Sequence, residues 1–151
     1  MQVETAAEMH TVVMREVAQT DIFVAAAAVA DYAPVEIAQE KIKKRNDNLE
    51  LKLTKTPDIL LQVAARVPRP FTVGFAAETE KLEAHAREKL EKKQLDMVAA
   101  NWVGNGRGFD RDDNALAVYW KDGAAELGNA PKIELARRLI RLVAEQYSRH
   151  R

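Results

Sequence analysis

The sequence predicts an α/β protein with an open, mostly parallel, Rossmann-like sheet and helices on both faces of that sheet. Two observations support this prediction. The continuously apolar segment at residues 22–30 is typical of a strand buried on both faces, as in a parallel sheet, and further strands are expected at 71–77 and 96–101. Segments with helical periodicity stand between them, and strands that alternate with helices through short connections imply right-handed crossovers.

Length and charge narrow the class of protein. The chain has 151 residues, of which 47% are hydrophobic and 30% are charged, so it can form both a core and a soluble surface. Basic and acidic residues are equal in number, 23 of each, whereas binding to nucleic acid normally needs a basic excess. We therefore expect one domain over residues 1–151 and no nucleic-acid partner.

Other residue types exclude further classes. The absence of Cys excludes disulfide scaffolds, thiolate zinc sites and cysteine nucleophiles, and it fits a reducing cytoplasm. The histidines, His10, His85 and His150, are too scattered to suggest a metal cage. The longest apolar stretch, 22–30, is far shorter than the ~20 residues that span a bilayer, and the N-terminus lacks a signal-peptide pattern. We expect a cytoplasmic protein without a membrane segment.

The chain is expected to begin with a helix. Thr5 and Glu8 have the spacing of a capping box, in which each side chain accepts a hydrogen bond from the other residue's backbone. Apolar residues then recur at helical spacing up to about Gln19. The first buried strand, 22–30, follows.

A loop, a short strand and a short helix come next. Residues 33–48 show no regular pattern, and at 49–53 leucine alternates with polar residues, as in a half-exposed strand. Thr56 is expected as the N-cap of a helix that has Pro57 and Asp58 in its first turn.

The remaining segments continue the alternation of strands and helices. They are a strand at 71–77, a helix at 80–94, a strand at 96–101, a Gly-rich loop at 104–113, a strand at 115–120 and a last helix opened by residues 129–131. The inner face of this last helix is expected to hold Ile133, Ala136, Ile140, Val143 and Tyr147.

Polar residues stand where several strands end. Asp31 follows the first strand, Glu78 and Thr79 follow the strand at 71–77, and Asn101 ends the next one. In an open α/β sheet, ligands bind in the crevice outside the carboxyl ends of the strands. From its position alone, Asp31 fits a ligand for a cation or a hydroxyl group as well as it fits a cap of the following turn.

A basic segment and a helix start together suggest an anion site. The basic residues are Lys41, Lys43, Lys44 and Arg45. A flexible basic loop can close over a triphosphate, although charge runs are usually solvated. The helix start at Pro57 adds free amides and a positive dipole end. Asp58 already complements that dipole, so only its backbone amide would serve a phosphate.

Further candidates have a plain structural explanation. Phe75 lies in a strand end of small residues and could face a planar ligand, but such a residue is more often core. Lys89 and Lys93 share a helix face with His85, which is usual for a solvated face. The glycine-rich residues 104–108 resemble part of a dinucleotide fingerprint, but they precede no clear amphipathic helix.

Six segments together resemble one family, the phosphopantothenate-cysteine ligases (phosphopantothenoylcysteine synthetases). In bacteria these usually form the C-terminal half of a bifunctional coenzyme A biosynthesis flavoprotein. The segments are AAVADY (27–32), EKIKK (40–44), KTPDIL (55–60), VGFAAET (73–79), KLEKKQLDMVAAN (89–101) and DNALAVYW (113–120). No single segment is decisive, but their order and spacing cover nearly the whole chain.

The resemblance implies a ligase reaction that consumes CTP. The carboxylate of 4'-phosphopantothenate is activated as an acyl-cytidylate with release of pyrophosphate, and the amine of cysteine then displaces CMP. The resemblance also implies Mg²⁺ and a homodimer. In the bifunctional proteins the ligase is fused to a flavin-dependent phosphopantothenoylcysteine decarboxylase, and no flavin is expected in the present segment.

The same resemblance implies a set of nucleotide-binding residues. The set is Asp31, Lys41, Lys55, Pro57, Asp58, Ile59, Leu60, Phe75, Lys89 and Lys93. Asp31 would be associated with both the nucleotide and the metal, and Lys41 would be the catalytic lysine of a flap that reaches the phosphates. Residues 57–60 would present backbone amides to the triphosphate, and Phe75 would flank the cytidine.

One difference from the family affects what the chain is expected to do. The family begins with a first strand and a loop of the SNxSSGKMG kind, which contributes an asparagine for handling the acyl-cytidylate, and this sequence contains no such loop. We therefore expect a domain truncated at its N-terminus, with weak or no CTP binding and little product. The alternatives are a Rossmann-like nucleotide or dinucleotide-binding module without ligase activity, and a structural dimerisation domain.

Overall fold

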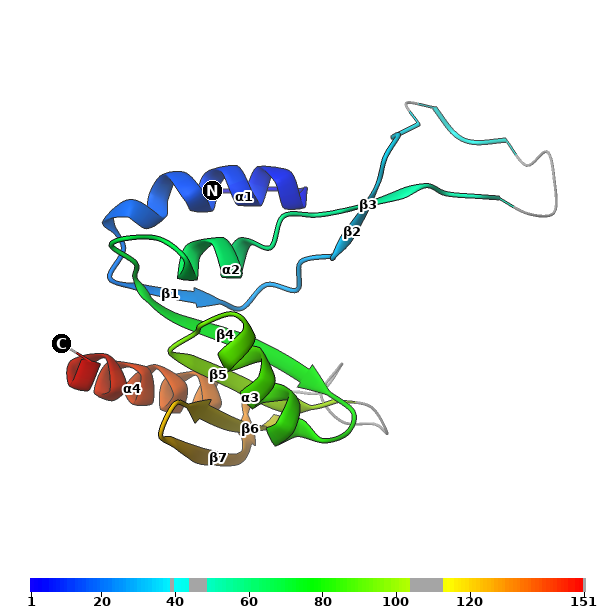
Figure 1. Cartoon of the computed structure of the whole chain (residues 1–151). Helices are drawn as coiled ribbons and strands as arrows, with labels where there is room; N and C mark the ends of the chain where they lie inside the picture. Colours follow the sequence, from blue (N-terminus) through cyan, green and yellow to red (C-terminus); the bar gives the residue numbers. More distant parts are fainter. Residues whose placement is uncertain (39, 44–48, 104–112, 151) are drawn as a thin grey trace.

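A five-stranded sheet organises the chain, with strand order β1-β4-β5-β6-β7 (Figure 1). The computed structural model describes residues 1–38, 40–43, 49–103 and 113–150. The elements in chain order are α1 (Ala6–Glu16), η1 (Val17–Gln19), β1 (Ile22–Ala25), β2 (Tyr32–Pro34), β3 (Leu53–Lys55), α2 (Ile59–Ala64), β4 (Phe71–Glu78), α3 (Leu82–Lys92), β5 (Met97–Trp102), β6 (Asp113–Trp120), β7 (Gly123–Pro131) and α4 (Lys132–His150). Within these ranges, no helix is long and apolar enough to cross a membrane.

The parallel part of the sheet consists of β1, β4 and β5. Ile22 of β1 pairs with Phe71 of β4, and Val73 of β4 pairs with Met97 of β5. Strands β6 and β7 extend the sheet in antiparallel pairing. The predicted α/β class is therefore confirmed, and the carboxyl ends of β1, β4 and β5 meet at one edge of the sheet.

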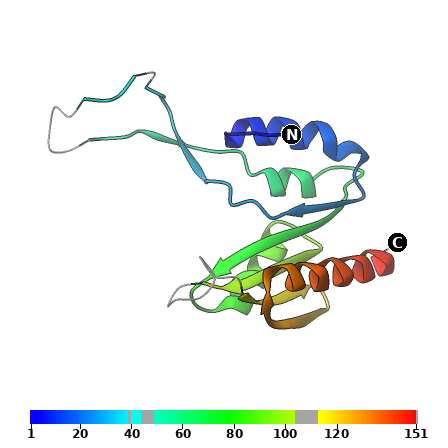
Figure 2. The same ribbon diagram turned by 180° about the vertical axis from the view of Figure 1, so that it is seen from behind.

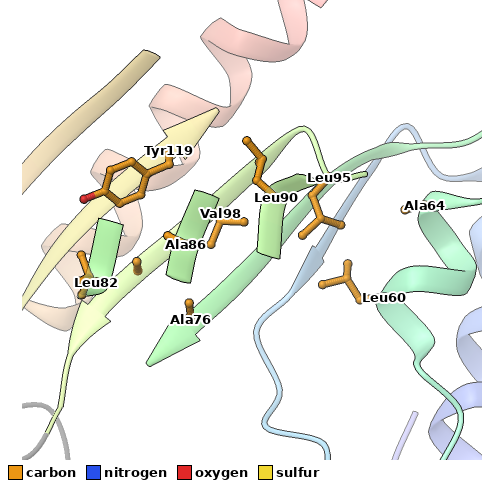
Figure 3. Packing of buried hydrophobic residues seen from close by; sticks show 10 residues of the cluster. Leu60, Ala64, Ala76, Leu82, Ala86, Leu90, Leu95, Val98 and Tyr119 are labelled. Carbon is orange, nitrogen blue, oxygen red and sulfur yellow. The ribbon is translucent and has the colours of Figure 1, made fainter. Parts of the chain in front are cut away.

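Apolar side chains pack on both faces of the sheet, which confirms the prediction that helices cover both faces. On the face covered by α2 and α3, the cluster that Figure 3 shows consists of Leu60, Ala64, Ala76, Leu82, Ala86, Leu90, Leu95, Val98, Ala100 and Tyr119. On the face covered by α4, the cluster consists of Phe71, Val73, Met97, Ala99, Leu116, Val118, Leu135, Leu139 and Val143. A smaller cluster joins η1 to α2 through Val17, Ile59 and Val63.

The N-terminal helix begins as the sequence predicts. The Thr5 side chain accepts a hydrogen bond from the Glu8 backbone at 3.1 Å, and the Glu8 carboxylate accepts one from the Thr5 backbone at 3.3 Å. The capping box is therefore confirmed.

The first strand is shorter than the prediction of 22–30. Pairing with β4 ends at Ala25, and residues 26–30 are exposed, with Val29 at 36% exposure. This second part is mostly alanine, which has little preference for strands and offers little side chain to bury. Apolar character alone therefore did not identify where the strand ends.

The last strand and the last helix also differ from the prediction. Residues 129–131 belong to β7, which the sequence analysis missed, and α4 begins only at Lys132. Helix α4 buries Leu135, Leu139 and Val143, whereas Ile133 and Ile140 of the predicted inner face are 65% and 56% exposed. Val143 and Tyr147 of the predicted face do pack in the cluster under α4, so the prediction was right for the end of the helix and wrong for its start.

Strands β2 and β3, with the described residues between them (35–38, 40–43 and 49–52), form an arm that extends from the body of the molecule (Figures 1 and 2). They pair in antiparallel register, with Tyr32 opposite Lys55 and Pro34 opposite Leu53. The predicted strand at 49–53 is therefore displaced toward Lys55, and all three residues of β3 are exposed. The arm thus presents large apolar side chains to solvent.

A buried carboxylate joins the connections that enter β4 and β5. The Arg69 guanidinium binds both oxygens of Asp96, at 2.6 and 2.8 Å, and the Thr72 backbone and hydroxyl donate to Asp96 at 2.7 and 2.9 Å. Burial acts to raise the pKa of Asp96, but the hydrogen bonds from Arg69 and Thr72 outweigh burial and hold that pKa below its usual value. This network fixes the amino-terminal ends of two neighbouring strands.

Replacing Asp96 with Asn should lower the free energy of unfolding at pH 7 by about 2 to 3 kcal/mol, because hydrogen bonds to a buried charge are lost. The folded-state pKa of Asp96 lies below its unfolded value, so its ionised form contributes stability above about pH 4. That contribution is lost as the pH falls through the folded-state pKa. Urea denaturation of both proteins across this pH range should show the difference shrinking.

The matched control is Asp122→Asn in the exposed turn between β6 and β7, which should change stability by less than about 0.5 kcal/mol. A difference between the Asp96 variant and the parent chain that stays constant down to low pH would contradict a role for the charge.

Candidate functional site

The segment after β1 is tied to the segment before α2. The Thr56 backbone donates to the Asp31 carbonyl at 2.9 Å, and the Thr56 hydroxyl donates to the Ala30 carbonyl at 2.6 Å. These two bonds bring Asp31 next to the turn at Pro57. Two of the positions that the sequence analysis selected, 31 and 57, are therefore neighbours, one just before β2 and the other just before the cap of α2.

Asp58 caps the start of α2, which corrects the predicted role of Thr56 as the N-cap. One Asp58 oxygen accepts a hydrogen bond from the Leu61 backbone at 3.0 Å, and the other pairs with the Lys93 ammonium at 2.9 Å. Burial acts to raise the pKa of Asp58, but Lys93 and the Leu61 amide outweigh burial and lower that pKa. The side chain of Asp58 thus occupies the helix start itself.

Lys89 lies at the centre of the charged groups. It is half-buried, and its ammonium donates to the Phe75 carbonyl of β4 at 2.6 Å. Burial lowers the pKa of Lys89 and the nearby Lys93 lowers it further, while the charges of Glu78, Asp58 and Asp31 act to raise it. We use the name carboxyl-edge cluster for Asp31, Asp58, Lys89 and Lys93.

The apolar residues of the predicted site turn their side chains into the core. The Phe75 ring packs with the cluster under α4, on the sheet face opposite α3. Ile59 and Leu60 are buried in the clusters around α2. Phe75, Ile59 and Leu60 would therefore contact a ligand at this edge of the sheet through backbone atoms. The Phe75 carbonyl is already bound by Lys89.

The two remaining lysines of the predicted site lie on the arm. Lys55 is the last residue of β3, and Lys41 belongs to the described segment 40–43, which extends away from the body in Figures 1 and 2. Within the described residues, no hydrogen bond or ion pair joins either lysine to the carboxyl-edge cluster. Lys44 and Arg45 of the basic segment and the glycines at 104–108 lie outside the described residues.

One tether was not recognised from the sequence. Thr56 was selected as a helix cap, but its hydroxyl instead binds a carbonyl 26 residues earlier in the chain. Short-range patterns carry no signal for such a long-range bond, although a Thr that precedes Pro57 is free to adopt the extended conformation that this bond requires.

Two hollows lie at the opposite edge of the sheet. A hollow of about 680 Å³ lies among Phe71, Leu90, Leu95, Asp96 and Trp120, and a second of about 440 Å³ lies between η1 and the end of α4. Neither is lined by a residue of the predicted site. We give more weight to the carboxyl-edge cluster, because it combines opposite charges at the edge where α/β sheets bind ligands.

Asp31 is the carboxylate predicted to hold a metal. Among the described residues, no group of three or more His, Asp or Glu side chains could hold a metal ion. Mg²⁺ is commonly bound through one or two carboxylates together with substrate phosphates and water. The residues present therefore fit a magnesium ion only if it arrives with a phosphorylated substrate.

Replacing Asp58 with Ala should lower the free energy of unfolding by about 1 kcal/mol, because the Leu61 amide loses its cap. Asp58→Asn is the matched variant, since Asn caps helices as well as Asp but carries no charge for Lys93. Urea denaturation should therefore rank the Asn variant close to the parent chain and the Ala variant below both. Equal losses in the two variants would instead assign the stabilisation to the Lys93 ion pair.

Relatives of the chain were found among curated sequences. It is 49% identical over 148 residues to the coenzyme A biosynthesis bifunctional protein CoaBC of Vibrio cholerae, and 43% identical over 150 residues to that of Escherichia coli K12. These alignments cover 95% and 96% of this chain and 37% of each relative. The chain thus spans little more than a third of the length of the curated relatives it matches.

Solved structures share the fold. The C-terminal domain of a CoaBC protein superposes with a TM-score of 0.75 at 30% identity, covering 95% of this chain and 63% of that one. A Cab2 mutant in complex with phosphopantothenate-cysteine superposes with a TM-score of 0.77 at 15% identity, covering 99% of this chain and 52% of that one, which shows the fold alone.

A family model extends the likeness over almost the whole sequence. The model of the DNA/pantothenate metabolism flavoprotein C-terminal domain matches residues 1–147. This range includes the carboxyl-edge cluster, the arm and every strand of the sheet. The chain therefore belongs to the family of DNA/pantothenate metabolism flavoprotein C-terminal domains.

Proposed function

We propose that this chain is the CTP-binding part of a phosphopantothenate-cysteine ligase that acts in the cytoplasm in coenzyme A biosynthesis. The observation that carries the proposal is the grouping of charged side chains near the end of β1, where Asp58 pairs with Lys93 and Lys89 donates to the Phe75 carbonyl. Asp31 lies on the neighbouring segment, which Thr56 ties to the start of α2. Membership of the flavoprotein C-terminal domain family and identity to CoaBC proteins support it.

The first half of the proposed reaction needs positive charge. A carboxylate oxygen of 4'-phosphopantothenate attacks the α-phosphorus of CTP, and the bond to the β-phosphate breaks to release pyrophosphate. Both reactants are anions, so cations must offset their repulsion as negative charge builds up in the transition state. We assign this role to Lys89 of α3, to Lys93 at the C-cap of that helix, and to Lys41 once the arm segment 40–43 reaches the phosphates.

A bound triphosphate would compete with the Asp58 side chain at the start of α2. Asp58 holds both the Leu61 amide and the Lys93 ammonium in the structure. A triphosphate that binds Lys93 replaces one partner of this ion pair, so Asp58 weakens nonspecific anion binding at this helix start. Asp31 would hold Mg²⁺ together with the phosphates, and that ion would supply further positive charge at the reacting phosphate.

The second half of the reaction is acyl transfer. The cysteine amine attacks the acyl carbon, the bond between that carbon and the CMP oxygen breaks, and the amine loses a proton. No protein nucleophile is needed, which agrees with a sequence that contains no Cys. We expect the chain by itself to make little product, because the resemblance assigns an essential asparagine to a loop that this sequence does not contain.

The chain should bind CTP with Mg²⁺ more tightly than ATP or NADH, with an affinity in about the millimolar range. Lys41→Gln and Lys89→Met should each weaken CTP binding, because each removes a cation from the phosphate site. Isothermal titration calorimetry with the three nucleotides measures this directly.

Lys121→Gln is the control, because Lys121 lies in the turn between β6 and β7 at the opposite edge of the sheet. It should leave CTP binding unchanged. A preference for NADH would support the dinucleotide-binding alternative. No response to CTP, ATP or NADH would favour a structural domain. Rapid ligase turnover by the chain alone would contradict the assignment of an incomplete site.

We also propose that the arm joins two copies of the chain in a homodimer. Its exposed large apolar residues are Tyr32, Val35, Ile37, Ile42, Leu49, Leu51 and Leu53. A two-stranded hairpin is marginally stable by itself in water, and apolar patches of this kind mark interaction sites. The strand at 115–120 is in β6, which pairs with both β5 and β7 and so has no free edge for a partner.

The relatives suggest a further fusion partner. CoaBC proteins are bifunctional by name, and this chain aligns with 37% of the Vibrio cholerae protein. We propose that the ligase works in a polypeptide or complex that also contains the flavin-dependent phosphopantothenoylcysteine decarboxylase. The product of the ligase is the substrate of that decarboxylase.

Charges placed on the arm should separate the copies. The double variant Leu51→Glu and Leu53→Glu is expected to be monomeric in sedimentation velocity, while the parent chain sediments as a dimer, because buried like charges oppose association. Ile133→Glu is the matched control, since Ile133 is 65% exposed on α4, away from the arm. If the Ile133 variant were monomeric and the arm variant dimeric, the interface would lie on α4 and not on the arm.

A further inference from the structure

The segment that leads from β1 to the arm is held at its end by a single residue. Residues 26–31 follow the last residue of β1, Ala25, and all of them are exposed. Within the described part of the chain, the hydrogen bonds that Ala30 and Asp31 make both come from Thr56. The position of Asp31 therefore depends on Thr56.

The two bonds hold the peptide groups on both sides of the Asp31 α-carbon. The Thr56 hydroxyl donates to the Ala30 carbonyl at 2.6 Å, and the Thr56 backbone donates to the Asp31 carbonyl at 2.9 Å. Each carbonyl belongs to a planar peptide group, one before and one after the Asp31 α-carbon. When both planes are held, the direction in which that α-carbon presents its side chain is held as well.

Thr56 is itself rigid, and it leads directly to the start of α2. Its β-branched side chain has few χ1 rotamers, and a residue that precedes proline favours the extended backbone. After Pro57, Asp58 caps α2 and pairs with the Lys93 ammonium at 2.9 Å. Two stiff residues, Thr56 and Pro57, thus set the position of Asp31 relative to the ion pair between Asp58 and Lys93.

We propose that Thr56 is a positioning residue whose hydroxyl fixes the direction of the Asp31 carboxylate beside the start of α2, where the metal and the phosphates would bind. The inference rests on the proposed function for the identity of the ligand, but not for the effect of the hydroxyl on Asp31. The backbone bond remains in any variant that keeps the amide, so the hydroxyl is what this side chain adds. Without it, only one of the two peptide planes around Asp31 is held.

The effect on Asp31 is tested without any ligand, by ¹⁵N relaxation of the backbone. Thr56→Val keeps the branched shape but lacks the hydroxyl, so the order parameters of Ala30 and Asp31 should fall from about 0.85 toward about 0.6. Thr56→Ser keeps the hydroxyl and should stay near the parent chain. Thr54→Val is the matched control, because Thr54 is exposed on β3 and its hydroxyl makes no hydrogen bond among the described residues.

The effect on the ligand is tested by titrating Mg²⁺ at a fixed concentration of CTP and measuring bound CTP. The Mg²⁺ concentration at half-maximal binding should be about fivefold higher in Thr56→Val than in the parent chain, and unchanged in Thr56→Ser. In an Asp31→Asn background, Thr56→Val should cause no further change, because Thr56 acts through Asp31. A solely structural role would lower CTP binding at saturating Mg²⁺ without moving the midpoint.

The outcomes separate this inference from the proposed function. Unchanged order parameters at Ala30 and Asp31 in Thr56→Val overturn the inference, whatever the nucleotide result. Lower order parameters together with no CTP response in the parent chain support the effect of Thr56 on Asp31 and refute the proposed function. A midpoint that does not move, or a further loss in the Asp31→Asn background, overturns the claim that Thr56 acts through the Asp31 carboxylate. Thr56→Ala also lacks the hydroxyl and should reproduce each effect of Thr56→Val, with circular dichroism to verify that both variants fold.

Discussion

The parallel pairing of β4 with β1 and β5 is the constraint on which the rest of the molecule depends. The register sets Gly74 of β4 beside Ala25 at the end of β1, and Glu78 beside Trp102 at the end of β5. Strand β1 ends beside the middle of β4, and Lys89, near the end of α3, donates to the Phe75 carbonyl at that point. Asp58, Lys89 and Lys93 can therefore meet near the end of β1 although they are far apart in the sequence.

The amino-terminal ends of the strands are fixed separately from this edge. Asp96 binds Arg69 and Thr72, so one buried carboxylate holds the entry to both β4 and β5. The charged groups of the two edges differ in their surroundings. Asp96 has its partners within a compact network, whereas the Lys89 ammonium is bound by a neutral carbonyl and pairs with no carboxylate among the described residues. The first arrangement stabilises the fold, and the second leaves charge that a ligand can use.

Much of the fold could be predicted from the sequence, because its signals are local. The capping box at Thr5, the buried strand β4 and the amphipathic helix α3 follow from spacing and apolar pattern. The end of β1, strand β7 and the rotation of α4 could not be predicted in this way. Each depends on which neighbour covers an apolar residue, and a sequence window contains no information about that neighbour.

The candidate site was predictable to a smaller extent. Asp31 could be selected because it follows a strand, but Lys89 and Lys93 have the spacing of an ordinary solvated helix face and were chosen only through a family resemblance. The bonds from Thr56 to residues 30 and 31 and the cap by Asp58 depend on long-range geometry. The ring of Phe75 packs with the cluster under α4, and its contact with a cytidine stays a prediction.

The unequal support of the strands has a consequence for amide hydrogen exchange. Strand β4 has a partner on each side, whereas within the described residues β1 is bonded to β4 alone and the arm strands only to each other. Local opening is cheapest where the fewest neighbouring bonds must break with it. Amides of the arm should therefore exchange with deuterium first, those on the outer side of β1 next, and those of β4 last. The strand that carries the Phe75 carbonyl is then more rigid than β1 and the arm.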